Sequence, residues 1–110
     1  MPLRQLARSQ WQEYFDRVSK AIGARRVEVE VTGLGLADQI GAHWVALTGL
    51  SYDPKDDVLI VVAGDLQQRI HPARVDIDHA FDWLHGVDVV DAEGNHYIVQ
   101  LKEPLNLPAP

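Results

Sequence analysis

The hydrophobic pattern of this chain changes period once, and this change limits the fold more than any other feature. One apolar stripe at the 3.6-residue spacing of an α-helix runs through residues 9–22 and is formed by Trp11, Tyr14, Phe15, Val18 and Ile22. From Val27 onward, apolar and polar residues alternate instead, which is typical of half-buried strands. The sequence therefore predicts one N-terminal helix followed by a sheet.

Both ends of the predicted helix carry recognisable signals. Ser9 is in position to cap the N-terminus, and Gln12, three residues later, completes a capping-box pattern. Gly23 supplies the residue type that most easily adopts the left-handed conformation found after many helices. We therefore expect the helix to span about residues 9–22.

Six later segments have the composition of strands. They cover residues 26–32, 43–52, 58–63, 74–79, 86–91 and 95–102. Because short turns connect them, neighbouring strands are expected to run antiparallel. We predict a single α+β domain, 1–110, in which the helix is followed by a strongly bent antiparallel sheet or small barrel of five to six strands. Residues 103–110, with three prolines, are expected to form an extended tail.

The length and the absence of cysteine narrow the chemistry. A chain of 110 residues fits one domain. Without cysteine there can be no disulfide, thiol nucleophile or thiolate zinc site. The longest apolar run, residues 58–63, is far shorter than the ~20 residues of a membrane-spanning helix. We expect a cytoplasmic protein that does not enter a membrane.

Charge is distributed unevenly along the chain, whose formal net charge is −6. Residues 1–26 hold six basic and two acidic side chains, which gives +4, whereas the rest holds four basic and fourteen acidic ones, which gives −10. Arg17 and Lys20 have acidic partners on the predicted helix, whereas four arginines have no such local partner: Arg4, Arg8, Arg25 and Arg26. These arginines either contact the acidic sheet face of a neighbouring molecule, which we expect to carry Glu28, Glu30, Asp76 and Asp78, or fold back on their own chain.

Five segments carry a resemblance to known proteins: residues 11–19, 26–31, 50–59, 70–72 and 89–94. They are similar to a family of short single-domain bacterial proteins of unknown function. This resemblance covers most of the chain, and it implies a free-standing bacterial domain but no catalytic residue. The order of one helix followed by strands is also similar to that of the Sm-like small barrels, a likeness of fold alone.

The richest group of potential binding residues lies between positions 71 and 85. Its members are His71, Asp76, Asp78, His79 and His85. In a strand, Asp76 and Asp78 point to one side and His79 to the other. No pair in this group has the spacing of zinc ligands, so we interpret it as a hydrated acidic face with scattered histidines. A small ligand- or metal-binding region remains the alternative, and no metal site, cofactor or catalytic residue is predicted.

Phe81, Trp83 and Leu84 form an apolar group in a segment expected to be a loop. Such a loop either folds under as a lid on the core or forms an exposed contact patch, and the sequence leaves both open.

These observations favour a non-catalytic protein-interaction or oligomerisation module, with a second copy or another protein as partner. Its candidate contact residues are Arg4, Arg8, Arg25, Arg26, Phe81, Trp83 and Leu84. An Sm-like nucleic-acid binder is the alternative from another class. It is disfavoured because a body with a charge of −10 repels phosphate.

Overall fold

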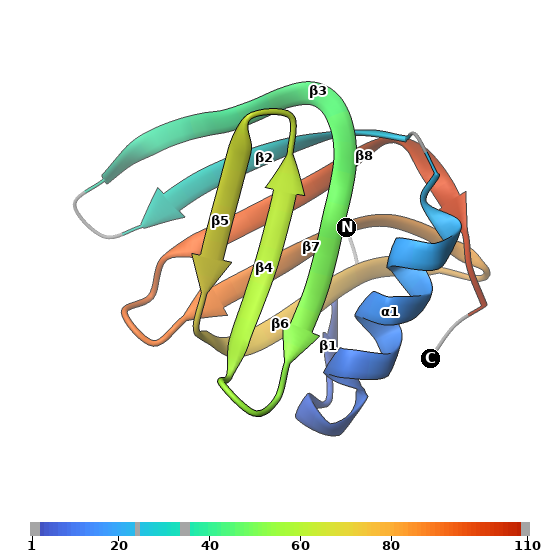
Figure 1. The fold of residues 1–110 in the computed structure, drawn as a ribbon, viewed down its shortest axis with the longest axis horizontal. Coiled ribbons are helices and arrows are strands. Elements are labelled where there is room, and N and C mark those ends of the chain that lie inside the picture. Colours follow the sequence, from blue (N-terminus) through green and yellow to red (C-terminus); the bar gives the residue numbers. More distant parts are fainter. Residues whose placement is uncertain (1–2, 24, 34–35, 109–110) are drawn as a thin grey trace.

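The computed structural model describes residues 3–23, 25–33 and 36–108, which form one helix and an eight-stranded antiparallel sheet (Figure 1). The elements in chain order are β1 (Arg4–Leu6), the short 3₁₀ turn η1 (Arg8–Gln10), α1 (Trp11–Ala21), β2 (Arg26–Gly33), β3 (Leu36–Asp53), β4 (Val58–Ala63), β5 (Leu66–Ile70), β6 (Pro72–Ala80), β7 (Trp83–Asp91) and β8 (His96–Asn106). Within the sheet the strands lie in the order β1-β6-β7-β8-β2-β3-β4-β5.

The sheet bends sharply along β3, whose 18 residues belong to both halves of the molecule. The first part of β3 pairs with β2, and the part from Leu47 onward pairs with β4. Trp44 has a φ of 50°, and register shifts lie near it in both pairings. Such bulges sharpen the bend of a strand. As a result β3, β4 and β5 lie across β2, β8, β7 and β6, and α1 packs beside β3 (Figure 1).

The core lies between the two halves of the sheet and α1. The predicted helical stripe is buried there in full, from Trp11 to Ile22. The strands contribute alternate side chains, among them Val27, Val29, Leu59, Val61, Val75, Ile77, Val87, Val89 and Val99. The other side of β6, β7, β8 and β2 therefore forms an outer face that α1 does not cover.

The predicted antiparallel sheet with one helix is confirmed, but the number of strands differs. The sheet has eight strands, and no pairing within the described ranges joins β1 to β5, so it is open and not a barrel of five to six strands. The two unpredicted strands, β1 and β5, are its edges. Both are short and largely polar, as edge strands often are, and they lack a clear alternating pattern.

Several strands are also longer than predicted, most clearly β3, β7 and β8. β3 begins at Leu36, β7 begins at Trp83 within the expected loop, and β8 continues to Asn106 through part of the expected tail. Pro104 is accommodated because residues 101–104 have no partner on β7: the pairing passes from Leu84–Leu105 directly to Gly86–Gln100.

The helix begins differently from the prediction. Ser9 lies in the 3₁₀ turn, and α1 starts at Trp11 with Gln10 before it and without a side-chain cap. The side chain of Gln10 instead accepts a hydrogen bond from the Ala7 backbone N–H at 3.3 Å. Gly23 follows the helix with a φ of 60°, as predicted. In the part of the chain that the structure describes, no helix is long and apolar enough to cross a membrane.

Candidate functional site

Acidic side chains from three strands share the outer face of the sheet. Direct cross-strand pairs form one row that holds Asp76, Asp88, Ile98 and Glu30, and a second row that holds Asp78, Gly86, Gln100 and Glu28. Because directly paired residues project to the same face of a sheet, these side chains form one continuous surface. This surface holds the four carboxylates expected on one face, but Asp76 and Asp78 are only 5% and 6% exposed, so the interpretation of a hydrated face is wrong for these two residues.

Three of these carboxylates have a basic partner. Asp76 lies 2.9 Å from Arg74, Asp88 lies 3.1 Å from Nδ1 of His96, and Glu28 lies 2.7 Å from Nδ1 of His43. Asp78 differs from them. It is as buried as Asp76, but its Oδ2 has no hydrogen-bond partner among the residues that the structure describes.

A cavity of about 420 Å³ opens on the outer face beside Asp78. It forms where His85 of β7 lies opposite the four residues 101–104 of β8, so that the two strands separate locally. Gly86, in the second row, adds no side chain to fill the hollow. The side chains that define its walls are Leu3, Asp78, His85, Ile98, Lys102 and Pro104.

The structure brings together only part of the predicted group between positions 71 and 85. Asp78 and His85 line the cavity, and Asp76 lies on the same face beside Arg74. His71 lies elsewhere, with its Nδ1 2.9 Å from the backbone carbonyl of Asp57. No cluster of three or more metal-ligating side chains occurs within residues 3–23, 25–33 and 36–108.

His79 points away from this face, as the alternation in β6 predicts, and it is buried against α1. Its Nδ1 lies 3.0 Å from the hydroxyl of Tyr14, and its Nε2 lies 2.9 Å from the carbonyl oxygen of Leu107. A carbonyl only accepts, so Nε2 of the neutral ring carries the proton and the Tyr14 hydroxyl donates to Nδ1. Burial raises the pKa of Tyr14 well above its usual value. His79 is therefore a structural residue that joins helix and sheet.

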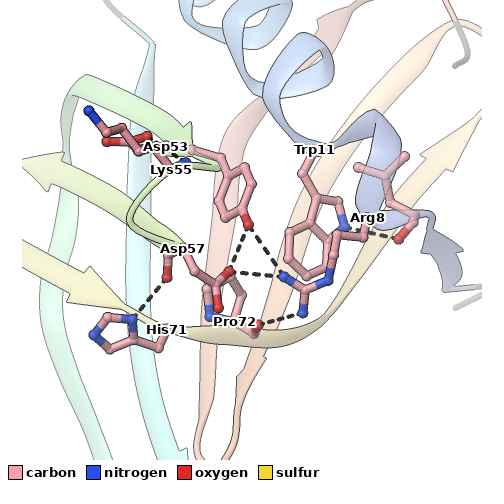
Figure 2. A network of polar contacts seen from close by, with 9 residues as sticks. Arg8, Trp11, Asp53, Lys55, Asp57, His71 and Pro72 are labelled. Atoms are coloured by element: carbon pink, nitrogen blue, oxygen red, sulfur yellow. Dashed lines mark hydrogen bonds and ion pairs between the residues drawn. The ribbon is translucent and has the colours of Figure 1, made fainter.

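The sequence suggested that Arg8 has no local partner, but the structure places it in a network that we call the Arg8 clasp (Figure 2). The clasp consists of Arg8, Trp11, Tyr52, Asp57 and Pro72. The guanidinium of Arg8 donates to the Asp57 carboxylate at 2.9 Å, to the Tyr52 hydroxyl at 3.3 Å and to the Pro72 carbonyl at 3.3 Å. It also lies 4.3 Å from the centroid of the Trp11 ring. The clasp ties the N-terminal segment to the β3–β4 turn and to the start of β6.

The clasp changes the acidity of its members. The Tyr52 hydroxyl donates to Asp57 at 2.7 Å, and this bond together with that from Arg8 lowers the pKa of Asp57, although burial opposes the shift. Burial and the same bond raise the pKa of Tyr52. Arg8 therefore already has partners within its own chain, although its side chain is 55% exposed.

Of the remaining candidate arginines, Arg4 lies apart from the adjacent Arg25 and Arg26. Arg4 lies on β1 opposite Ile77. Arg25 donates to the carbonyls of Ala21 and Ile22 at the end of α1, at 3.3 and 3.1 Å. Arg25 and Arg26 also line a second, polar hollow of about 320 Å³ with Lys102 and Glu103. The basic N-terminal residues therefore do not form the single track along which phosphates bind.

The predicted aromatic loop is the tip of the β6–β7 hairpin. Ala80 pairs with Trp83, which leaves a two-residue loop of Phe81 and Asp82. Phe81 is 93% exposed and Trp83 is 45% exposed, whereas Leu84 is fully buried in the core. Leu84 therefore packs the hairpin against the core. Of the three apolar residues, only Phe81 and Trp83 reach the surface.

Several residues of these sites were not recognised in the sequence. Gly86, Asp88, Gln100 and Lys102 lie on strands that were predicted, but their common surface with Asp78 depends on which strands are neighbours. The alternation within residues 86–91 and 95–102 would have placed them on one face once the order β6-β7-β8 was known.

Comparisons with known proteins agree with the expected resemblance. Residues 3–110 match the model of a family described as a family of unknown function (DUF5335). A protein of Aquifex aeolicus (strain VF5), described as an uncharacterized protein, is 34% identical over 110 residues, which cover 98% of this chain and 99% of that protein. No solved structure matches the chain significantly.

Proposed function

We propose that this chain, which belongs to the DUF5335 family of proteins of unknown function, is a non-catalytic interaction module. It associates with a second copy of itself through the tip of its β6–β7 hairpin. The observation that carries the proposal is the state of Phe81. This aromatic side chain is 93% exposed at the end of a hairpin, with Trp83 half-exposed beside it.

The backbone of Phe81 makes its exposure more informative. Its φ is 55°, whereas Asp82 has no positive φ. Two-residue hairpin loops with a positive φ at the first position normally have glycine there, because a side chain is strained in that conformation. Neither the conformation of the turn nor packing in the core of its own chain therefore explains a phenylalanine at position 81. An exposed aromatic side chain at the tip of a hairpin is instead well suited to contact another protein.

A contact between two copies needs only one such patch. In a two-fold arrangement the same surface faces itself, so one hairpin tip meets another and Phe81 and Trp83 are covered on both molecules. The other large exposed apolar side chains of the described surface are Leu3, which precedes β1, and Ile40, which lies on β3.

The test is the mass of the chain in solution, measured by light scattering over a range of concentrations at low and high salt. We expect a mass that rises above 12.3 kDa with concentration for the natural chain, and no rise for Phe81→Gly. Ile40→Thr, which removes an apolar side chain of 49% exposure from β3, is the matched control and should associate normally. A strict monomer at both salt concentrations would sink the proposal.

A further inference from the structure

The outer-face cavity suggests a binding site that is independent of the hairpin tip. We propose that this cavity binds a small organic cation, a primary ammonium with a short apolar chain, and that Asp78 is its counter-ion. The inference rests on the state of Asp78, on the charges around it and on the apolar walls of the cavity.

Asp78 is a buried acceptor without a donor. Its side chain is 6% exposed, and no described residue bonds to its Oδ2. An ionised carboxylate can only accept hydrogen bonds, and burying such an oxygen without a donor is costly. Its neighbours on the same face show the usual solution, since Asp76 and Asp88 each have a basic partner within 3.1 Å. A bound ammonium group would give Asp78 the basic partner that Asp76 and Asp88 already have.

The charges around the cavity favour a cation over an anion. Asp78 and Asp88 both line it, against a single lysine, Lys102. The Lys102 ammonium lies 5.9 Å from the centroid of the Trp44 ring, on β3, and forms no salt bridge with Asp78. Two carboxylates would therefore repel an anionic ligand, whereas they would attract an ammonium ion.

The walls of the cavity account for the apolar part of the ligand. Leu3, Ile98 and Pro104 supply apolar surface around Asp78 and His85. Ligand sites typically combine an apolar lining with a few placed polar groups, in a volume of roughly 300–1,000 Å³. The volume here, about 420 Å³, suits a small molecule. The site also lies beside two irregularities of the sheet, at Asp78–His79 and at Leu84–Gly86, and such bulges often adjoin binding sites.

The test titrates the intact chain with three probes of equal length: n-butylammonium, butan-1-ol and butyrate. Amide NMR spectra report where each probe binds. We expect n-butylammonium at millimolar concentrations to shift the signals of Asp78, Gly86 and Gln100 saturably. Butan-1-ol should bind at least about tenfold more weakly because a charge-assisted hydrogen bond is lost. Preferred binding of butyrate, or no saturable shift with the ammonium, would overturn the proposal.

Two variants assign the binding to Asp78. Asp78→Asn keeps the size of the side chain but removes its charge, so we expect n-butylammonium to bind at least about tenfold more weakly. Asp65→Asn removes an exposed carboxylate from the β4–β5 turn and should leave binding unchanged. Equal affinity in Asp78→Asn and the natural chain would also overturn the proposal. If Asp78→Asn does not fold, the comparison of the three probes on the natural chain decides the question alone. Neither result depends on whether the hairpin tip associates.

Discussion

The hydroxyl of Tyr14 lies 3.0 Å from Nδ1 of the buried His79, and this hydrogen bond joins α1 to the inner face of β6. Replacing Tyr14 by Phe keeps the ring in the core but leaves Nδ1 of His79 without a donor. We expect the free energy of unfolding to fall by about 1–3 kcal/mol, the usual cost of an unsatisfied buried group. Urea unfolding at neutral pH measures the loss, and an unchanged midpoint and slope would show that the bond contributes nothing.

The Arg8 clasp should depend on the shape of the guanidinium and not only on its charge. Arg8→Lys keeps the positive charge but cannot reproduce the fork that reaches Asp57, Tyr52 and Pro72. We expect both Arg8→Lys and Arg8→Ala to unfold at lower urea concentrations than the natural chain, with Arg8→Lys closer to Arg8→Ala. If Arg8→Lys were as stable as the natural chain, the clasp would be a simple charge contact.

Stability should decrease in acid, because two carboxyl groups have a lower pKa in the folded chain. These are Asp57, which Tyr52 and Arg8 bond, and Asp91. Burial of Asp91 opposes its ionisation, but hydrogen bonds from Asn95, Glu93 and Tyr97 outweigh this effect. A depressed pKa stabilises the fold above the unfolded value of about 3.9, and this contribution disappears as the pH falls through the folded value.

The test of this pH dependence compares Asp57→Asn with the natural chain at about pH 7 and about pH 3. We expect the variant to be less stable at the higher pH and to lose less stability on acidification. Asp56→Asn is the control, because Asp56 is an exposed carboxylate of the same turn that is not part of the Arg8 clasp. An equal loss in Asp57→Asn and the natural chain would contradict the assignment.

Phe81→Gly should stabilise the isolated chain while removing its aromatic contact. The substitution relieves the strain of a side chain at a φ of 55°, and Phe81 has little packing to lose at 93% exposure. We expect the unfolding free energy of the monomer to rise by about 1 kcal/mol. Dilute samples, in which association is absent, provide the measurement. A loss of stability would mean that Phe81 serves the fold of its own chain.

The parts of the fold that were predictable are those recorded in local periodicity. The stripe from Trp11 to Ile22 identified the helix because 3.6-residue spacing is visible within a few turns. The edge strands β1 and β5 were missed because three and five largely polar residues carry no clear period. β1 also pairs with β6, which lies far along the chain, so no local pattern indicates its partner.

The candidate sites were predictable in composition but not in geometry. Asp78 and His85 were recognised as potential ligand residues, yet the cavity arises where β7 and β8 separate around residues 101–104. No local pattern records that register. The partners of Arg8 could not be identified from the sequence because Tyr52, Asp57 and Pro72 lie more than 40 positions away in the chain.

The most direct test of the proposed self-association uses the absence of cysteine from the natural chain. Asp82→Cys places a single thiol at the hairpin tip beside Phe81, and Asp56→Cys places one in the distant β3–β4 turn as a control. After mild oxidation, we predict a disulfide-linked dimer of Asp82→Cys, whose yield falls when Phe81→Gly is added, and little dimer of Asp56→Cys. Equal cross-linking of the two single-cysteine variants, or none in Asp82→Cys, would contradict tip-to-tip association.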